Sequence, residues 1–231
     1  MWGVFFCKNY KYILIMSNYN DFLKDFEKSI LRNKRAIEEV ELIAVSKKKS
    51  EDEILPVINL GHRTFGENQL QEVIKKWPSL KSQFDDIKVH YIGSIQSKKV
   101  HQIIEQCDVI HTLDREKIIG IISEIDYSKI KDKTFFIQVN TGSEVQKSGV
   151  NLDQVEVLIQ KCKNYNIKID GLMCLPPENE IPDKHFEILQ SLAKNNHLKY
   201  LSMGMTNDYD SALKYGATHI RVGTAIFGLR N

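Results

Sequence analysis

A lysine at the end of a predicted buried strand has the setting for covalent chemistry. Lys47 ends the run LIAVSK, so its side chain is expected at the mouth of the sheet that this strand joins. Burial disfavours the charged ammonium, and Lys48 and Lys49 add like-charge repulsion, so the pKa of Lys47 should fall. A neutral amine of this kind can form a Schiff base with a carbonyl compound. The same KKK run is also typical of a solvated turn, and the run alone does not decide.

Two loops late in the sequence have the composition of a phosphate site. SMGMT (202–206) opens a predicted helix with two hydroxyls and a glycine, and RVGTAIFG (221–228) ends a predicted strand with Gly223 and Thr224. Backbone amides freed by glycine at a helix start attract anions. The alternative is that the glycines only terminate strands. Because two such loops occur together, phosphate binding is favoured, and a lysine facing a phosphate cradle suits a phosphorylated aldehyde.

The elements that must position these residues alternate between strand and helix. Strands are predicted over 42–46, 63–66, 89–93, 109–113, 134–140, 169–174, 200–204 and 219–223. Helices are predicted over 20–39, 50–60, 67–77, 97–106, 115–126, 152–165, 183–196 and 207–216. Eight strand–helix units predict an α/β fold, the (β/α)8 TIM barrel, whose active sites lie at the carboxyl ends of the strands. A doubly wound open sheet is the rival, but no GxGxxG follows the first strand.

Composition excludes several classes of protein. The chain has 231 residues, a net charge of +2 and 42% hydrophobic residues, so it has enough apolar content for a large core and is not disordered. Its near-neutral charge favours neither nucleic acid nor a membrane as a partner. Its four cysteines and seven histidines form no metal-binding spacing. We therefore expect no metal site and reduced thiols, as in a cytoplasmic protein.

The first fifteen residues differ from the rest. They read MWGVFFCKNYKYILI, which is apolar and aromatic but interrupted by Lys8 and Lys11. The uninterrupted runs are too short for a membrane span, and no cleavage site of a signal peptide follows them. We expect Met16 to be the native start, residues 1–15 to be a non-core extension, and residues 16–231 to form a single barrel domain. A membrane-surface anchor is the alternative for residues 1–15.

Seven motifs together point to one family. They are AVSK (44–47), FGEN (65–68), HYIGSIQSKK (90–99), QVNTGSEVQKSG (138–149), GLM (171–173), LSMGMT (201–206) and RVGTAIFG (221–228). With these motifs the chain resembles the pyridoxal phosphate homeostasis proteins, the YggS/PROSC family of single-domain barrels that bind pyridoxal 5'-phosphate (PLP). The resemblance spans the chain from the first strand onward. It implies a barrel like the N-terminal domain of alanine racemase, with PLP as cofactor.

The resemblance also implies roles at the reactive end of the cofactor. Lys47 matches the lysine that forms a covalent aldimine with PLP, and Arg221 matches the arginine that faces the pyridine nitrogen. Asn68, in FGEN, matches an asparagine beside the cofactor. Two positions depart from the family pattern, because Lys98 replaces an asparagine and Cys174 replaces a small or hydroxyl residue. We expect Cys174 to be a buried, inert thiol.

At the phosphate end, the resemblance implies a second group of contacts. Gly223 and Thr224 match residues that contact the phosphate. Thr206 matches a further contact, at which the family more often has serine, and it retains the hydroxyl. Met203 and Gly204 are implied to line the site next to this loop.

The implied function is that of a carrier or reservoir in intracellular PLP homeostasis, with PLP-dependent apoenzymes as recipients. A permanent cation at the pyridine nitrogen disfavours its protonation, which leaves a poor electron sink for catalysis. We therefore expect a non-catalytic PLP-binding protein. One alternative is a PLP-dependent amino-acid racemase, which needs a second base; Tyr91 and Tyr209 are more typical of packing or solvated tyrosines. The other is a phosphosugar Schiff-base lyase, which needs a carboxylate beside Lys47 and binds sugar without PLP.

Overall fold

The chain folds into a closed barrel of eight parallel strands, and the computed structural model describes it over residues 2–142 and 148–228. The strands follow one another around the barrel in sequence order, and β8 pairs with β1 to close it. Their bounds are β1 Glu41–Val45, β2 Thr64–Glu67, β3 Lys88–Tyr91, β4 Val109–Leu113, β5 Thr134–Val139, β6 Gly171–Cys174, β7 Tyr200–Ser202 and β8 His219–Val222. The predicted TIM barrel is confirmed, and so is the position of every predicted strand.

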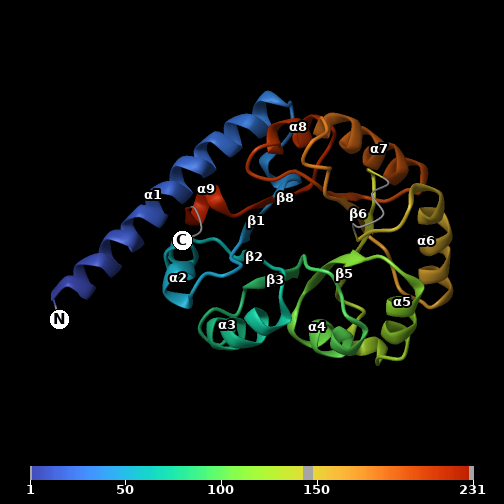
Figure 1. The fold of residues 1–231 in the computed structure, drawn as a ribbon, viewed down its shortest axis with the longest axis horizontal. Coiled ribbons are helices and arrows are strands. Elements are labelled where there is room, and N and C mark those ends of the chain that lie inside the picture. The colour runs from blue at the N-terminus through green and yellow to red at the C-terminus, as the bar shows by residue number, and fades with distance from the viewer. Residues whose placement is uncertain (1, 143–147, 229–231) are drawn as a thin grey trace.

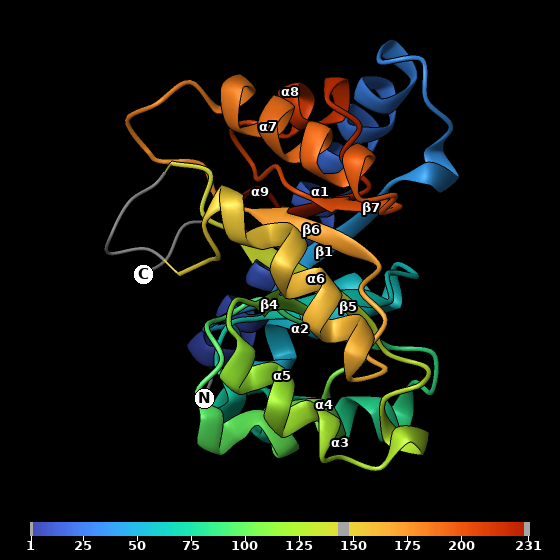
Figure 2. The same ribbon diagram turned by 90° about the vertical axis from the view of Figure 1, so that its right-hand side faces the viewer.

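Helices pack around the outside of the barrel (Figure 1 and Figure 2). Their bounds are α1 Trp2–Arg32, α2 Glu51–Asn59, α3 Leu70–Gln83, α4 Val100–Gln106, α5 Glu116–Ser123, α6 Val155–Asn164, α7 Pro182–Asn195, α8 Tyr209–Lys214 and α9 Thr224–Phe227. Single-turn 3-10 helices are η1 Ile37–Glu39, η2 Ser97–Lys99, η3 Tyr127–Lys129 and η4 Leu152–Gln154. The short helix α9, which directly follows β8, was not predicted.

The bounds of two predicted helices differ most from those in the structure. The helix expected over 67–77 starts at Leu70 and continues past Pro78 to Gln83, because Trp77 and Leu80 on either side of the proline are both buried. Apolar spacing therefore outweighs the cost of an interior proline. The helix expected over 20–39 ends at Arg32, since Lys34 adopts a left-handed φ of +57° that stops it.

The apolar core lies between the barrel wall and the surrounding helices. Helix α6 shows why, because its buried residues Val155, Leu158 and Cys162 recur at helical spacing and face the strands. Side chains on the strands alternate between this outer core and the inside of the barrel. The carboxyl ends of all the parallel strands meet at one rim, so residues that directly follow the strands gather there.

Helix α1 begins well before the predicted domain boundary. It runs along one side of the barrel with its first turns projecting beyond it (Figure 1). Its buried stripe consists of Ile15, Tyr19, Phe22, Phe26 and Ile30. The boundary expected at residue 16 therefore falls inside the packed part of the helix, one residue after Ile15. In the part of the chain that the structure describes, no helix has the length and apolar character to cross a membrane.

Contacts ahead of Ile15 tie the same helix to α2. Lys11 Nζ lies 2.9 Å from Glu53 Oε1, and Asn59 Nδ2 donates to the Tyr12 hydroxyl at 2.8 Å. These are polar contacts at the surface, which contribute little to stability. The side chains of residues 1–9 lie outside the described part. That residues 1–15 can be removed without loss of the barrel stays a prediction.

Two isoleucines of α1 provide a matched test of this packing. Ile15 is 2% exposed and Ile13 is 65% exposed. Ile15→Ala should lower the free energy of unfolding by about 2–5 kcal/mol, and Ile13→Ala should change it by less than about 0.5 kcal/mol. Urea denaturation of both variants measures the difference. A chain that begins at Met16 should still form the barrel, and its free energy of unfolding should fall by the same amount as in Ile15→Ala. Equal stability of Ile15→Ala and Ile13→Ala would contradict the packing of Ile15.

Candidate functional site

Lys47 lies at the carboxyl-terminal rim between two anchored neighbours. Ser46 is fully buried, and its hydroxyl donates to Glu67 Oε1 at 2.7 Å. The backbone N–H of Lys48 donates to Glu72 Oε2, and Lys48 adopts a φ of +62°. Lys47 itself is half-buried, whereas Lys48 is exposed. The backbone that carries Lys47 is therefore fixed from both sides.

The third lysine of the run has a separate structural role. Lys49 Nζ donates to the carbonyl oxygen of Phe227, the last residue of α9, at 3.0 Å, and it lies 3.5 Å from Glu53 Oε1. It thereby joins the loop after β1 to the helix after β8. The KKK run is thus not a uniformly solvated turn, because its three side chains differ in burial and in partners.

A buried ion pair behind the barrel wall supports this part of the rim. Lys76 Nζ, on α3, lies 2.5 Å from Glu67 Oε1 and donates to the Ser46 carbonyl oxygen at 3.0 Å. Burial raises the pKa of Glu67, and the charge of Lys76 offsets part of that rise. Removing one partner of a buried pair typically costs about 3–5 kcal/mol, so the pair strongly fixes the ends of β1 and β2.

Arg221 places a buried positive charge inside the barrel below the rim. It is 4% exposed; its Nη1 donates to Ser202 Oγ at 2.6 Å, and its Nη2 donates to the Cys174 carbonyl oxygen at 3.0 Å. Burial lowers the pKa of Arg221, but a guanidinium stays charged in proteins. Both hydrogen-bond acceptors are neutral oxygens rather than a carboxylate. The charge of Arg221 therefore remains available to an electron-rich group.

The loops after β7 and β8 lie side by side. Thr206 Oγ1 and Thr224 Oγ1 are 3.2 Å apart, so the two hydroxyls can contact the same bound group. Gly204 has a φ of +94°, and a Cβ there would lie 2.6 Å from Ala212 Cβ, so the turn requires glycine. Gly223 directly precedes α9. The structure thus brings together the predicted phosphate residues Thr206, Thr224 and their glycines.

Asn68 and Met203 have contrasting positions. Asn68 is half-buried just after β2. A Cβ at position 93 would lie 2.0 Å from the carbonyl oxygen of Asn68, so the loop after β3 can approach Asn68 this closely only because residue 93 is glycine. Met203 is fully buried in the apolar core. Because Ser202 points into the barrel, strand alternation turns Met203 outward. The side chain of Met203 therefore supports the strand from behind, and that residue 203 lines the site stays a prediction that its backbone would have to fulfil.

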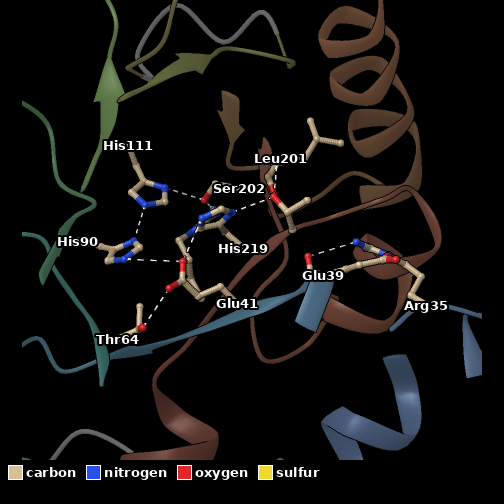
Figure 3. A network of polar contacts seen from close by, with 11 residues as sticks. Arg35, Glu39, Glu41, Thr64, His90, His111, Leu201, Ser202 and His219 are labelled. Atoms are coloured by element: carbon tan, nitrogen blue, oxygen red, sulfur yellow. Dashed lines mark hydrogen bonds and ion pairs between the residues drawn. The ribbon is translucent and has the colours of Figure 1, made fainter. Parts of the chain in front are cut away.

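A chain of polar side chains crosses the inside of the barrel below Arg221, and the sequence did not predict it (Figure 3). Ser202 Oγ lies 2.9 Å from His111 Nδ1, and His111 Nε2 lies 2.9 Å from His90 Nδ1. His90 Nε2 in turn lies 3.9 Å from Glu41 Oε2. The signal was present as a polar residue on the inward face of four strands, in ELIAV, KVHY, VIHTL and YLS.

Glu41 ends this chain at the amino-terminal face of the barrel. Its Oε2 lies 3.1 Å from His219 Nε2, and its Oε1 accepts from Thr64 Oγ1 at 3.1 Å. Burial by itself would raise the pKa of Glu41, but the hydrogen bond from His219, together with the charge that His90 acquires only in strong acid, brings it down to about 2. Burial lowers the pKa of His90 to about 3, so its ring is neutral at pH 7. Glu41 is thus an anion next to neutral imidazole.

Other reactive groups in the described residues are inert or dispersed. Burial raises the pKa of Cys174 to about 12, so its thiol stays protonated, as predicted for a buried cysteine. Within residues 2–142 and 148–228, no three His, Cys, Asp or Glu side chains are grouped to hold a metal ion. Residues 143–147 of the QVNTGSEVQKSG motif lie outside the described residues.

Comparison with known proteins identifies the family. Residues 23–231 match the family described as "Alanine racemase, N-terminal domain". The chain is also 35% identical over 228 residues to a pyridoxal phosphate homeostasis protein of Haemophilus influenzae, a match that covers 94% of this chain and 96% of that protein. The chain belongs to the pyridoxal phosphate homeostasis protein family. The resemblance carried by the seven sequence motifs is therefore confirmed.

Solved structures agree with this assignment. An unknown protein from Bifidobacterium adolescentis matches with a TM-score of 0.87 at 26% identity, covering 94% of this chain and 96% of that chain. PipY of Synechococcus elongatus, in a structure with PLP bound, matches with a TM-score of 0.75 at 26% identity, covering 93% of this chain and 100% of that chain. The barrel is thus shared with a relative that holds PLP.

The buried histidine and carboxylate predict loss of stability in acid. In the unfolded chain His90 takes up a proton near pH 6.5 and Glu41 near pH 4.5, but in the folded protein they do so only near 3 and 2. Protonation therefore favours the unfolded chain, and stability falls as pH drops from 6.5 towards 3 for His90 and from 4.5 towards 2 for Glu41, by up to about 1.4 kcal/mol per pH unit per group. Urea denaturation between pH 7.5 and 4.5 measures the slope.

A surface histidine provides the control for this prediction. His101 is exposed at the start of α4, and His101→Gln is the control substitution because that ring makes no buried contact. His90→Asn should make the free energy of unfolding fall less steeply as the pH is lowered. A free energy of unfolding that stays constant from pH 7.5 to 4.5 would show that His90 is not buried as a neutral ring.

Proposed function

We propose that the protein is a carrier or reservoir of PLP that holds the cofactor as a covalent aldimine on Lys47 and serves PLP homeostasis. The observation that carries the proposal is the pairing of β1 with β8, in which Ile43 lies opposite Arg221. This register supports a site in which the Lys47 amine and the buried Arg221 cation act on one small molecule. The family assignment and the PLP-bound relative support PLP as that molecule.

The residues at the rim fit the reactive parts of PLP. The Lys47 amine condenses with the aldehyde and releases water, which is a reversible step that stores the cofactor. Thr206 and Thr224, with hydroxyls 3.2 Å apart, offer two donors to the phosphate, and Gly204 and Gly223 leave room for it. Each of these roles is part of the proposal.

The remaining contacts concern the ring. Arg221 faces the pyridine nitrogen in the proposal, and Asn68 lies beside the ring. A buried cation facing that nitrogen keeps it unprotonated, because protonation would bring two positive charges together. An unprotonated ring withdraws electrons poorly and stabilises carbanions poorly. The site therefore suits storage of PLP rather than its use in catalysis, and we propose that the protein is not an enzyme.

The racemase alternative needs a second base near the substrate, and the two tyrosines that sequence suggested are occupied elsewhere. Tyr91 is 2% exposed, and burial raises its pKa to about 12. Tyr209 packs its ring against Phe22 and Phe26 of α1, with centroid distances of 5.4 and 5.7 Å. Neither tyrosine supports a base at the rim.

The lyase alternative needs a carboxylate free to exchange protons beside Lys47. Glu67 is the acidic residue nearest the end of β2, but its Oε1 is bound by Lys76, Ser46 and Trp77 behind the barrel wall. That arrangement supports a structural role for Glu67. It does not favour sugar cleavage at Lys47.

The proposal includes the cytoplasm as the site of action and PLP-dependent apoenzymes as the recipients of the cofactor. The described cysteines Cys107, Cys162 and Cys174 are all free and buried, which is compatible with a reducing compartment. A reversible imine suits transfer, because it releases intact PLP by hydrolysis. An experiment for transfer mixes loaded protein with an apoenzyme of this class and follows recovery of the apoenzyme's activity.

Substitution of Lys47 tests the covalent attachment. Lys47→Ala should abolish the PLP adduct that borohydride reduction fixes to the protein, whereas Lys48→Ala should retain it because Lys48 is exposed. Some noncovalent binding should persist through Thr206 and Thr224. Absorbance and mass spectrometry after reduction measure the adduct. An undiminished adduct in Lys47→Ala would assign the Schiff base to another lysine.

Substitution of Arg221 tests the contact with the ring. Arg221→Gln keeps an amide donor for Ser202 but removes the charge, so the fold should survive while the absorbance spectrum of bound PLP shifts. Loss of a charged hydrogen bond worth about 1.5–3 kcal/mol predicts about 10- to 100-fold weaker PLP binding. Arg221→Lys should restore part of the affinity. Normal affinity with an unshifted spectrum in Arg221→Gln would remove Arg221 from the site.

A further inference from the structure

The hydrogen bonds below Arg221 have a favoured direction at their upper end. A guanidinium only donates, so Ser202 Oγ accepts the proton of Arg221 Nη1 at 2.6 Å. The Ser202 hydroxyl proton is then best directed to His111 Nδ1 at 2.9 Å, but the second lone pair of the hydroxyl would also let it accept from His111, so Arg221 favours this direction without enforcing it. A neutral imidazole that accepts at Nδ1 carries its proton on Nε2. His111 therefore donates from Nε2 to His90 Nδ1 at 2.9 Å.

The lower end requires the same direction. Since His90 accepts at Nδ1, its own proton lies on Nε2, the atom that is 3.9 Å from Glu41 Oε2. His90 Nε2 is buried and makes no hydrogen bond to any described residue. In the opposite direction the lone pair of this nitrogen would face the carboxylate, and the Ser202 hydroxyl would have two donors aimed at it. Both ends thus select one arrangement, which runs from Arg221 to Glu41.

This arrangement joins two opposite charges through three neutral groups. Each group turns its acceptor towards the cation of Arg221 and its proton towards the anion of Glu41. Aligned hydrogen bonds polarise one another, so the charge at one end strengthens the bonds at the other. Ser202, His90 and His111 are each fully buried, which keeps this coupling unscreened by solvent.

Glu41 is the member of the chain with the most exposed side chain, at 33%. It lies with His90 in the lining of a cavity of about 450 Å³ at the amino-terminal face, to which Glu39, Lys88 and His219 also contribute. Its carboxylate is held by His219 and Thr64, so it is a fixed anion rather than a mobile one. The cofactor rim and this cavity lie at opposite ends of the barrel.

We propose that Glu41 is a positioning residue for Arg221, acting across the barrel through His90, His111 and Ser202. The proposal rests on the proposed function, since the contact of Arg221 with PLP belongs to that function. Glu41 fixes the direction of the hydrogen bonds between these side chains, and the hydrogen bonds fix the orientation of the Arg221 guanidinium. The amino-terminal face thereby contributes to cofactor affinity without touching the cofactor.

The first experiment uses the protein without PLP and needs no binding. Nitrogen-15 NMR of the histidine rings distinguishes the two neutral tautomers. His90 and His111 should both carry the proton on Nε2 in the unchanged protein. Glu41→Gln should produce a mixture of tautomers at His90 and His111. Glu39→Gln is the matched control, because Glu39 lines the same cavity but pairs with Arg35 at 3.0 Å, and it should change neither ring.

The second experiment adds PLP to the same proteins. Glu41→Gln should weaken PLP binding by about three- to tenfold and shift the absorbance of bound PLP in the direction seen for Arg221→Gln. Glu39→Gln should match the unchanged protein. If Glu41→Gln does not fold, Ser202→Ala interrupts the chain beside Arg221 while Glu41 stays in place, and it should produce the same weakening and shift.

The two experiments separate this proposal from the proposed function. Failure of the unchanged protein to bind PLP would overturn the proposed function. The histidine tautomers would still test the direction of the hydrogen bonds between Arg221 and Glu41. A proton on Nδ1 of His111 in the unchanged protein would overturn the direction of the chain. PLP binding and spectrum unaffected by Glu41→Gln, or by Ser202→Ala in its place, would overturn the positioning role.

Discussion

The pairing of β8 with β1 is the contact on which the rest of the structure depends. It sets Glu41 opposite His219 and Ile43 opposite Arg221, although each pair is separated by most of the chain. Because parallel strands share a direction, this register brings Lys47 and the loop after β8 to the same rim. Lys49 strengthens the closure at the rim by its bond to Phe227, and Arg35 does so at the other end by donating to the carbonyl oxygen of Ala217.

The sequence was sufficient for the architecture because the barrel's elements carry strong local signals. Each strand is a short apolar run followed by a polar turn, and α6 shows its buried stripe at helical spacing. Bounds were predicted less well where tertiary packing overrode a local rule. The burial of Trp77 and Leu80 keeps α3 helical across Pro78, and the burial of Ile15 places packed helix ahead of the domain boundary expected at residue 16. Helix propensity alone does not predict the stabilisation that comes from tertiary packing.

The residues at the rim were predictable because they follow strand ends and repeat family motifs. The structure brings Thr206 beside Thr224 and buries Arg221 next to β1, and that these residues bind PLP stays a prediction. The side chain of Met203 lies in the apolar core although the residue belongs to a site motif, which strand alternation explains. The interior chain was missed from the sequence. His90 and His111 are far apart in sequence, and only closure of the barrel makes them neighbours.

Closure by β8 also dictates the order in which the protein is completed during synthesis. β1 emerges from the ribosome roughly 180 residues before its partner, a delay of about 10–35 s at ordinary elongation rates. During that interval one edge of β1 is unpaired, and the apolar stripe of α1 lacks α8 and α9, against which it packs in the finished barrel. The nascent chain therefore exposes an unpaired strand edge and an apolar helix face, both of which can associate with other chains. The site at the rim is the last part of the molecule to form.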